Sequence, residues 1–311
     1  MIVSLSYDSS ATSSICLKGT SCVIHQNVPL SQYTTYRVGG KARWYAEPKC
    51  WQDVEALFQW VEKQQIPFVA LGAGSNLLVS DNGFEGLVIS TRHLRGCSID
   101  EEKRIITVDA GYPLPKLAWK MAKKGWLGLQ WAVGIPGTIG GAVVMNAGAH
   151  QCSISDILIN TTVASPNGKI ETIPASQLDY SYRHSRLQQE SCLVLQATLA
   201  LKPGMGREEV MELTSKNFRM RRETQPYDKP SCGSVFRNPK PYAAGWLIEK
   251  TGLKGYQIGG AMVSHQHANF ILNMGNATAR NIFDLIRYVQ ERVEATWSIL
   301  LQPEVKFLGQ F

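Results

Sequence analysis

Residues 134–148, GIPGTIGGAVVMNAG, constrain the fold of this chain more than any other stretch. Five glycines and a proline interrupt apolar residues there, where an ordinary strand or helix would carry side chains. Glycine lacks a Cβ atom and readily adopts positive φ, so successive backbone N–H groups can converge on an anion or a flat ring at close range. The run therefore predicts a loop that lies against a bound ligand.

Two further glycine-rich turns point the same way. Residues 71–79, LGAGSNLLV, follow the apolar run 67–70, and residues 35–40, TYRVGG, place a cation before two glycines. Each turn alone is equally compatible with a purely structural role. Taken together, the turns predict a cradle for one long ligand.

The glycine turns do not match the common nucleotide-binding loops. No Gly-Lys-Ser/Thr occurs in the chain, so the phosphate-binding lysine of a Walker loop has no counterpart. In the 71–79 turn, Leu77 stands where a dinucleotide fingerprint has its third glycine, and strand or turn residues follow it instead of a helix. Both P-loop and ordinary Rossmann chemistry are disfavoured.

Six motifs, in order along the chain, resemble those of the UDP-N-acetylenolpyruvoylglucosamine reductase family. These flavoenzymes make the muramic acid precursor of peptidoglycan. The similarity begins near residue 27 and continues to the C-terminus, and the short interval between Arg183 and Ser234 resembles members that lack an inserted loop whose tyrosine caps the uridine diphosphate. The motifs are Thr34–Gly40, Leu71–Ile89, Gly134–Ala149, Tyr182–Ser185, Gly233–Pro239 and Pro303–Lys306.

The resemblance implies an α/β (α+β) fold, in which a two-lobed FAD-binding domain of the vanillyl-alcohol-oxidase (PCMH) type precedes a C-terminal α/β substrate-binding domain. We expect an N-terminal extension at 1–26, the lobes at 27–91 and 92–205, and the substrate domain at 206–311. Apolar periodicity and turn signals predict the elements. They are helices at 51–64, 114–124, 208–220 and after a Thr278 cap, strands at 67–71, 86–90, 104–109, 192–201 and 304–308, and a hairpin turn at 166–168.

The cofactors implied by the resemblance are non-covalent FAD and NADPH as the reductant. The loops offer no persuasive His or Cys anchor for a covalent flavin. The residues expected to bind FAD come from the three glycine turns: Tyr36, Arg37, Gly39, Leu71, Gly72, Ala73, Gly74, Ser75, Asn76, Gly134, Ile135, Pro136, Gly137, Thr138, Gly140, Gly141, Asn146, Ala147 and Gly148.

Three residues are implied as catalytic, namely Arg183, Ser234 and Glu304. By resemblance, the reduced flavin delivers hydride to C3 of the enolpyruvyl group, Arg183 and Glu304 stabilise the enol, and Ser234 protonates C2. An arginine is always charged and can hold a carboxylate or a developing enolate. Burial would raise the pKa of a carboxyl group such as that of Glu304.

The substrate implied by the resemblance is UDP-N-acetylglucosamine enolpyruvate. Residues 216–240 carry seven Lys/Arg against two acids within a net charge of +7, which favours a polyanionic ligand. No nucleic-acid motif or stripe of interleaved aromatic residues is present, so a diphosphate is favoured over nucleic acid. The residues expected to bind substrate are Tyr182, Arg221, Arg222 and Asn238.

Composition completes the expectations. A hydrophobic content of 44% with 18% charged residues is typical of a soluble enzyme, and no apolar run is long enough to span a membrane. The seven cysteines are scattered without a CxxC pair, which favours a reducing cytoplasm and no metal site. We expect a cytoplasmic monomer.

Two other functions stay open at this point. An FAD-dependent oxidase of the same superfamily would act on a small alcohol or sugar with O₂. A nucleotide-sugar sensor would bind without turnover and would not need Arg183, Ser234 and Glu304 together.

Overall fold

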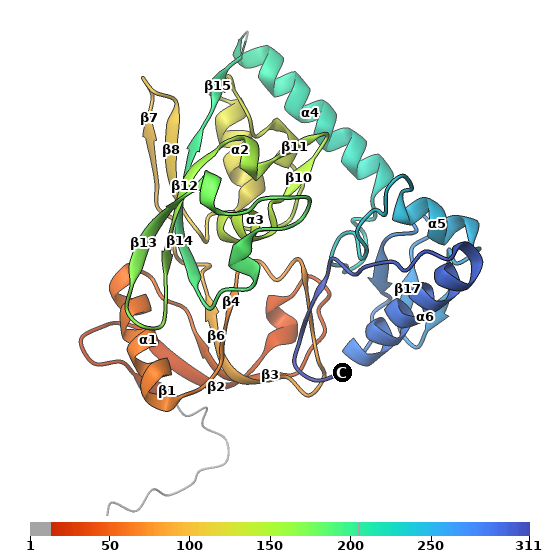
Figure 1. Cartoon of the computed structure of the whole chain (residues 1–311), viewed down its shortest axis with the longest axis horizontal. Coiled ribbons are helices and arrows are strands. Elements are labelled where there is room, and N and C mark those ends of the chain that lie inside the picture. The colour runs from red at the N-terminus through yellow and green to blue at the C-terminus, as the bar shows by residue number, and fades with distance from the viewer. Residues whose placement is uncertain (1–13, 205) are drawn as a thin grey trace, which may run out of the picture.

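The computed structural model describes residues 14–204 and 206–311 (Figure 1). Its first layer is a five-stranded mixed sheet in the order β1-β2-β3-β6-β4. The helix α1 (Trp51–Gln64) buries Leu57 and Phe58 in a core shared with Leu87 of the sheet. The strands are β1 (Ser14–Cys16), β2 (Val23–Pro29), β3 (Lys41–Ala46), β4 (Phe68–Leu71) and β6 (Phe84–Ser90).

A second five-stranded sheet, in the order β13-β12-β14-β8-β7, is antiparallel throughout. Two helices, α2 (Leu114–Ala122) and α3 (Ile139–Met145), contribute to its hydrophobic core. The strands are β7 (Cys97–Asp100), β8 (Ile105–Asp109), β12 (Leu158–Ala164), β13 (Ile170–Pro174) and β14 (Leu193–Ala200), and short pairs join β9 (Trp126–Leu127) to β15 (Lys202–Pro203) and β10 (Gly148–Ala149) to β11 (Cys152–Ser153).

The C-terminal part of the chain forms a separate helical and stranded unit, shown in blue in Figure 1. Its last strand, β19 (Lys306–Leu308), leaves this unit and pairs in parallel with β5 (Leu77–Val79) beside the first glycine turn. Its other elements are α5 (Ala244–Lys250), β16 (Gln257–Ile258), β17 (Ala261–Val263), β18 (Ile271–Asn273) and α6 (Ala279–Trp297). The helix α4 (Arg207–Thr224), drawn in teal, precedes this unit in the chain.

Most elements form where the sequence predicts them. Thr278 caps the helix α6. Its hydroxyl accepts the Asn281 N–H while the Asn281 side chain accepts the Thr278 N–H, so the expected cap is a capping box. The 166–168 turn joins β12 to β13. The predicted strand at 304–308 is shorter in the structure, where β19 begins at Lys306.

Three features differ from expectation. Residues 139–145 form the helix α3, although the glycine run predicts a loop there. The predicted start of the first lobe, residue 27, falls inside β2, and residues 1–13 of the predicted extension lie outside the described residues. The helix α4, predicted to open the C-terminal domain, packs against α2, and its Phe218 joins the core of the second sheet.

Candidate active site

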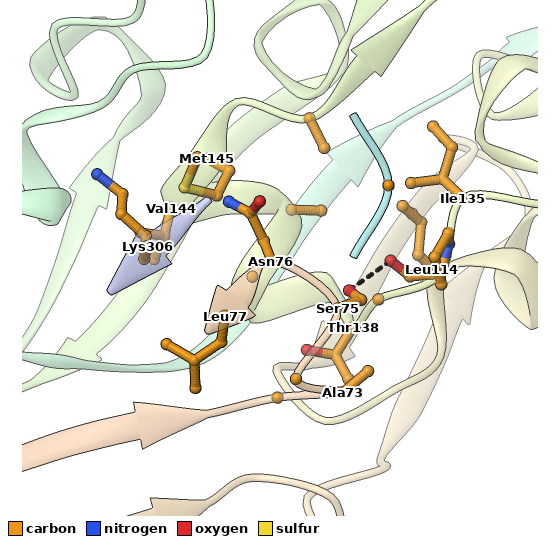
Figure 2. Close-up of a pocket in the computed structure, with 18 of the residues that line it drawn as sticks. Ala73, Ser75, Asn76, Leu77, Leu114, Ile135, Thr138, Val144, Met145 and Lys306 are labelled. Atoms are coloured by element: carbon orange, nitrogen blue, oxygen red, sulfur yellow. Dashed lines mark hydrogen bonds between the residues drawn. The ribbon is translucent and has the colours of Figure 1, made fainter. Parts of the chain in front are cut away.

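The two long glycine turns face each other across a cavity of about 630 Å³ (Figure 2). The first turn connects β4 to β5 and the second leads into α3. The Ser75 hydroxyl donates a hydrogen bond to the Pro136 carbonyl across 2.7 Å, which ties the two turns together. Of the predicted FAD-binding residues, those that line the cavity are Leu71, Gly72, Ala73, Gly74, Ser75, Asn76, Ile135, Pro136, Gly137, Thr138, Gly141, Ala147 and Gly148.

Neighbouring glycines in this cradle serve different purposes. A Cβ atom on Gly141 would lie in open cavity space, with Thr138 Oγ1 as its nearest neighbour at 3.8 Å. A Cβ atom on Gly140 would lie only 2.8 Å from the Cβ of Ala110, just beyond β8. Gly141 therefore leaves room for a ligand, whereas Gly140 lets α3 pack closely on the second sheet.

The third glycine turn does not reach the cavity. Tyr36 is fully buried, Arg37 is exposed, and a Cβ atom on Gly39 would meet Val79. The Thr35 N–H donates to the Gly74 carbonyl at 3.1 Å, so this turn supports the 71–79 turn.

Two more predicted cofactor residues lie just outside the cavity. A Cβ atom on Gly134 would lie 3.1 Å from side-chain atoms of Arg221 and Tyr227. The Asn146 side chain donates to the Ser181 carbonyl and accepts the Ser155 N–H. The Gly134 carbonyl accepts the Tyr227 hydroxyl at 3.0 Å, so both residues hold neighbouring loops in place.

Three charged or polar side chains form one wall of the cavity. Arg183, Ser234 and Glu304 all line it, although they are far apart in sequence. Arg183 Nε lies 2.9 Å from Glu304 Oε1, with side-chain exposures of 22% and 16%. Arg183 Nη2 also donates to the Gly148 carbonyl at 2.7 Å, which connects this wall to the second glycine run.

Asn76 connects the cradle to the segment that carries Glu304 and leads into β19. Its side-chain amide donates to the Glu304 carbonyl at 3.2 Å, and its own carbonyl accepts the Lys306 N–H at 3.0 Å. The Glu304 N–H donates to the Val235 carbonyl at 2.7 Å, next to Ser234. All three predicted catalytic residues are thus brought together by contacts among both lobes and the C-terminal unit.

Burial raises the pKa of the Glu304 carboxyl group above its ordinary value, although Arg183, Arg237 and Lys306 pull it in the opposite direction. Burial and the nearby Arg237 lower the pKa of Lys306, while Glu304 opposes that change. The wall therefore holds a carboxyl group that is more easily protonated than a free one.

Of the four predicted substrate-binding residues, Arg221 lines the cavity and the other three do not. Arg221 lines the cavity, burial lowers the pKa of its guanidinium, and its Nε is buried with no hydrogen-bond partner in the described chain. The side chain of Arg222 is exposed, and that of Tyr182 lies beside Arg183. Asn238 accepts the Ala244 N–H at the start of α5 and does not line the cavity.

Known proteins share this arrangement of sequence and fold. UDP-N-acetylenolpyruvoylglucosamine reductases from Synechocystis sp. and Nostoc sp. are 55% identical over 302 residues (96% of this chain, 95% of the relative) and 54% identical over 297 residues (96% and 90%). The solved structure of the Thermus caldophilus reductase superposes with a TM-score of 0.79 at 33% identity, covering 91% of this chain and 98% of that one. The chain belongs to the UDP-N-acetylenolpyruvoylglucosamine reductase family.

Two family models match separate parts of the chain. The model of the reductase C-terminal domain matches residues 225–308, and an FAD-binding domain matches residues 42–174. The predicted family and the predicted fold, a two-lobed FAD-binding domain joined to a C-terminal α/β domain, are confirmed. The protein is an FAD-containing, NADPH-dependent oxidoreductase of peptidoglycan precursor synthesis, and nothing favours the oxidase alternative.

The cradle fits the FAD expected for this family. Gly72, Gly137 and Gly141 line the cavity, and the buried Thr138 hydroxyl has no hydrogen-bond partner among the described residues. A polar atom buried in this way is costly unless a ligand or water meets it. The cavity volume lies in the range of cofactor sites.

Sequence reasoning missed a cationic opening beside the cradle. A second cavity of about 450 Å³ shares Gly72 and Thr138 with the first and adds Arg92, His93 and Arg95. Glu47 lies 3.4 Å from Arg92 Nε and 3.0 Å from His93 Nε2. The only available signal was the cation-rich run that follows β6.

No helix in residues 14–204 and 206–311 is long and apolar enough to cross a membrane. The same residues contain no group of three or more His, Cys, Asp or Glu side chains placed to hold a metal ion.

Proposed function

We propose that the wall formed by Arg183, Ser234 and Glu304 carries out the chemical step in reducing UDP-N-acetylglucosamine enolpyruvate to UDP-N-acetylmuramate. The observation that carries this assignment is the partly buried Arg183–Glu304 ion pair, which shares one cavity with Ser234 and with both glycine turns. The two glycine turns would hold FAD, which would supply the hydride for C3 of the enolpyruvyl group with NADPH as the reductant.

Arg183 and Glu304 would stabilise the negative charge that develops on the substrate carboxylate once C3 has been reduced. An always-charged guanidinium can share that charge, and a protonated carboxyl group can donate a hydrogen bond to it. The raised pKa of Glu304 supports this role, because it increases the protonated fraction at a given pH. Both side chains are pre-positioned by their mutual contact.

Ser234 would donate the proton that C2 needs to complete the lactyl group. It follows Gly233, whose φ is +75°, and precedes Val235, whose N–H is held by the Asn269 carbonyl. The backbone on both sides is thus defined, and the hydroxyl-bearing residue lines the cavity. A hydroxyl can protonate a strongly basic carbanion, which fits this enol intermediate.

Arg221 is our candidate for the substrate diphosphate, because it is the member of the predicted basic set that lines the cavity. Tyr182, next to Arg183, and Asn238, at the start of α5, would support the substrate site indirectly. We propose residues 206–311 as the substrate-binding unit of a cytoplasmic monomer. A monomer suffices, since one chain supplies every residue of the catalytic wall.

Substituting Ser234→Ala tests this assignment by separating the two half-reactions. Bleaching of the flavin by NADPH should stay near the wild-type rate, because that step precedes protonation of C2. Anaerobic reoxidation by the enolpyruvyl sugar should slow by at least ~10²-fold, the lower range for loss of a positioned general acid. Stopped-flow flavin absorbance measures both steps, and Ser231→Ala, outside the cavity lining, is the matched control.

The same experiment can reject the proposal. A Ser234→Ala enzyme that is slow in flavin reduction but normal in reoxidation would contradict the role of this serine. Wild-type enzyme reoxidised by air and not by the sugar would instead behave as the oxidase alternative requires.

A further inference from the structure

Arg183 occupies a backbone conformation that needs support. Its φ is +56°, in the left-handed region that residues other than glycine adopt at a cost. The turn around it is closed by two backbone hydrogen bonds between Ser181 and His184. The direction of the Arg183 side chain toward Glu304 depends on keeping this turn.

Two side chains donate hydrogen bonds to the Arg183 carbonyl, one from the same loop and one from the C-terminal unit. Gln188 Nε2 donates to it at 3.1 Å from the same loop. Arg237 Nη2 donates to it at 3.2 Å from the C-terminal unit, 54 residues away in sequence. Arg237 therefore fixes the turn relative to the unit that carries Ser234 and Glu304.

Hydrogen bonds hold the backbone from which the Arg237 side chain extends. Its backbone N–H donates to the Gln302 carbonyl at 2.9 Å, two residues before Glu304. The preceding residue, Phe236, is buried, and both its N–H and its carbonyl are bonded to the side-chain amide of Asn269 at 2.9 and 2.8 Å. Because this backbone is held in place, the Arg237 guanidinium can fix the position of the Arg183 turn across the interface.

Arg237 also contributes charge to the wall. The groups that face Glu304 are Arg183, Arg237 and Lys306, with the buried thiol of Cys232 close by. Arg237 lowers the pKa of Glu304 and of Lys306. Its Nε is buried and has no hydrogen-bond partner among the described residues.

We propose that Arg237 is a positioning residue for the reductase reaction. Its guanidinium donates to the Arg183 carbonyl and so keeps Arg183 within ion-pair distance of Glu304, across the interface between the second lobe and the C-terminal unit. The inference rests on the roles proposed above for Arg183 and Glu304. Arg237 acts on the backbone of one of these residues and on the charge of the other.

The test compares Arg237→Met and Arg237→Lys with Lys250→Met, which removes an exposed cation from α5. In the FAD-loaded enzyme, Arg237→Met should slow reoxidation by the enolpyruvyl sugar about 10-fold, since small misplacements of reacting groups are costly. Flavin reduction by NADPH and the KM for the sugar should change less than twofold. The pH at which reoxidation changes with the Glu304 carboxyl should move upward, because a nearby cation has been removed.

Arg237→Lys should restore the pH dependence but only part of the rate, because lysine replaces the charge without the planar fork. Equal slowing of both half-reactions in Arg237→Met, with loss of bound FAD, would show a merely structural role and overturn the proposal. Rates and pH dependence like those of Lys250→Met would also overturn it.

Substitutions of Glu304 separate this inference from the one beneath it. Glu304→Ala, which removes the hydrogen-bond donor as well as the ionisable group, tests the role of the carboxyl group. If Glu304→Ala reoxidises at the wild-type rate, the proposed role of Glu304 fails. If Glu304→Ala is slow and Arg237→Met is normal, only the inference about Arg237 fails. In the Glu304→Gln background, Arg237→Met should no longer shift the pH dependence.

Discussion

The glycine cradle and the catalytic wall enclose the same cavity but are built in different ways. The cradle consists of two continuous stretches, residues 71–76 and 135–148, and its shape depends on where side chains are missing. The wall consists of single side chains from three distant segments, around Arg183, Ser234 and Glu304. A cradle of this kind is a local property of the backbone, whereas the wall exists only after the C-terminal unit has docked.

Docking is therefore as important for function as the motifs themselves. The strand β19 pairs with β5, and Asn76 forms hydrogen bonds with both Glu304 and Lys306. The last residues of the chain are therefore attached to the 71–79 turn. The Arg183–Glu304 pair closes the interface from the other lobe. Substitutions in the cradle should alter cofactor binding, and substitutions in the wall should alter chemistry or substrate binding.

The largest expected effect lies in the cradle, where Gly141→Val should abolish tight FAD binding. The new side chain would enter open cavity space, and valine costs little in a helix that already tolerates glycine. Flavin affinity should fall at least ~10²-fold, which is about 3 kcal/mol. Flavin fluorescence titration measures the affinity, and acid precipitation of wild-type enzyme should release the flavin into the supernatant if it is non-covalent.

Gly140→Val is the matched comparison, because its Cβ atom would press on Ala110 and not on the cavity. Overpacking of this kind should lower the free energy of unfolding by about 1–3 kcal/mol. Full flavin occupancy in Gly141→Val would show that this face of α3 does not hold the cofactor. Loss of flavin in Gly140→Val without loss of stability would contradict the distinction between the two glycines.

The sequence predicts the cradle better than its surroundings, for a physical reason. Glycines at short spacing report a backbone that must be approached closely, and two of the three turns do line the cavity. The turn at 35–40 carries the same signal, yet its Gly39 relieves contact with Val79. A missing Cβ atom does not say whether a ligand or the protein itself needs the space.

The wall could be predicted only through resemblance to a family. Nothing local connects Arg183 with Glu304, and the contact that joins them depends on the path of the chain between them. The same holds for Arg92, His93 and Arg95, which face the second cavity from a segment with no motif. Within the basic run, helical geometry separates Arg221 from Arg222, and charge density alone could not.

A medium effect is expected at the cavity lining from Arg221→Ala. Loss of a charge-assisted contact with the diphosphate should raise the KM for the enolpyruvyl sugar about 10-fold, with kcat at saturation little changed. Arg222→Ala, whose side chain is exposed, should change KM less than twofold. Steady-state kinetics of both variants measure the difference. Equal effects of the two substitutions would show that net charge, and not the position of Arg221, attracts the substrate.

The smallest expected effect is on the pH dependence of the free energy of unfolding, and it follows from the raised pKa of Glu304. A carboxyl group whose folded-state pKa is raised binds protons more tightly in the folded chain. Its stabilising contribution is complete below the ordinary value of 4.5 and is lost as the pH rises through the folded-state pKa. Glu304→Gln cannot ionise and keeps an oxygen that can accept from Arg183 Nε.

The stability of Glu304→Gln relative to wild type should therefore increase as the pH rises from 4 to 7.5. Urea unfolding midpoints measured at saturating FAD would show the trend, because a fixed ligand excess keeps its contribution comparable. A difference that shrinks with increasing pH would mean that Arg183, Arg237 and Lys306 outweigh burial and hold the carboxylate ionised. Glu304 would then serve as a fixed negative partner for Arg183, and the hydrogen bond to the enol would have to come from Arg183 alone.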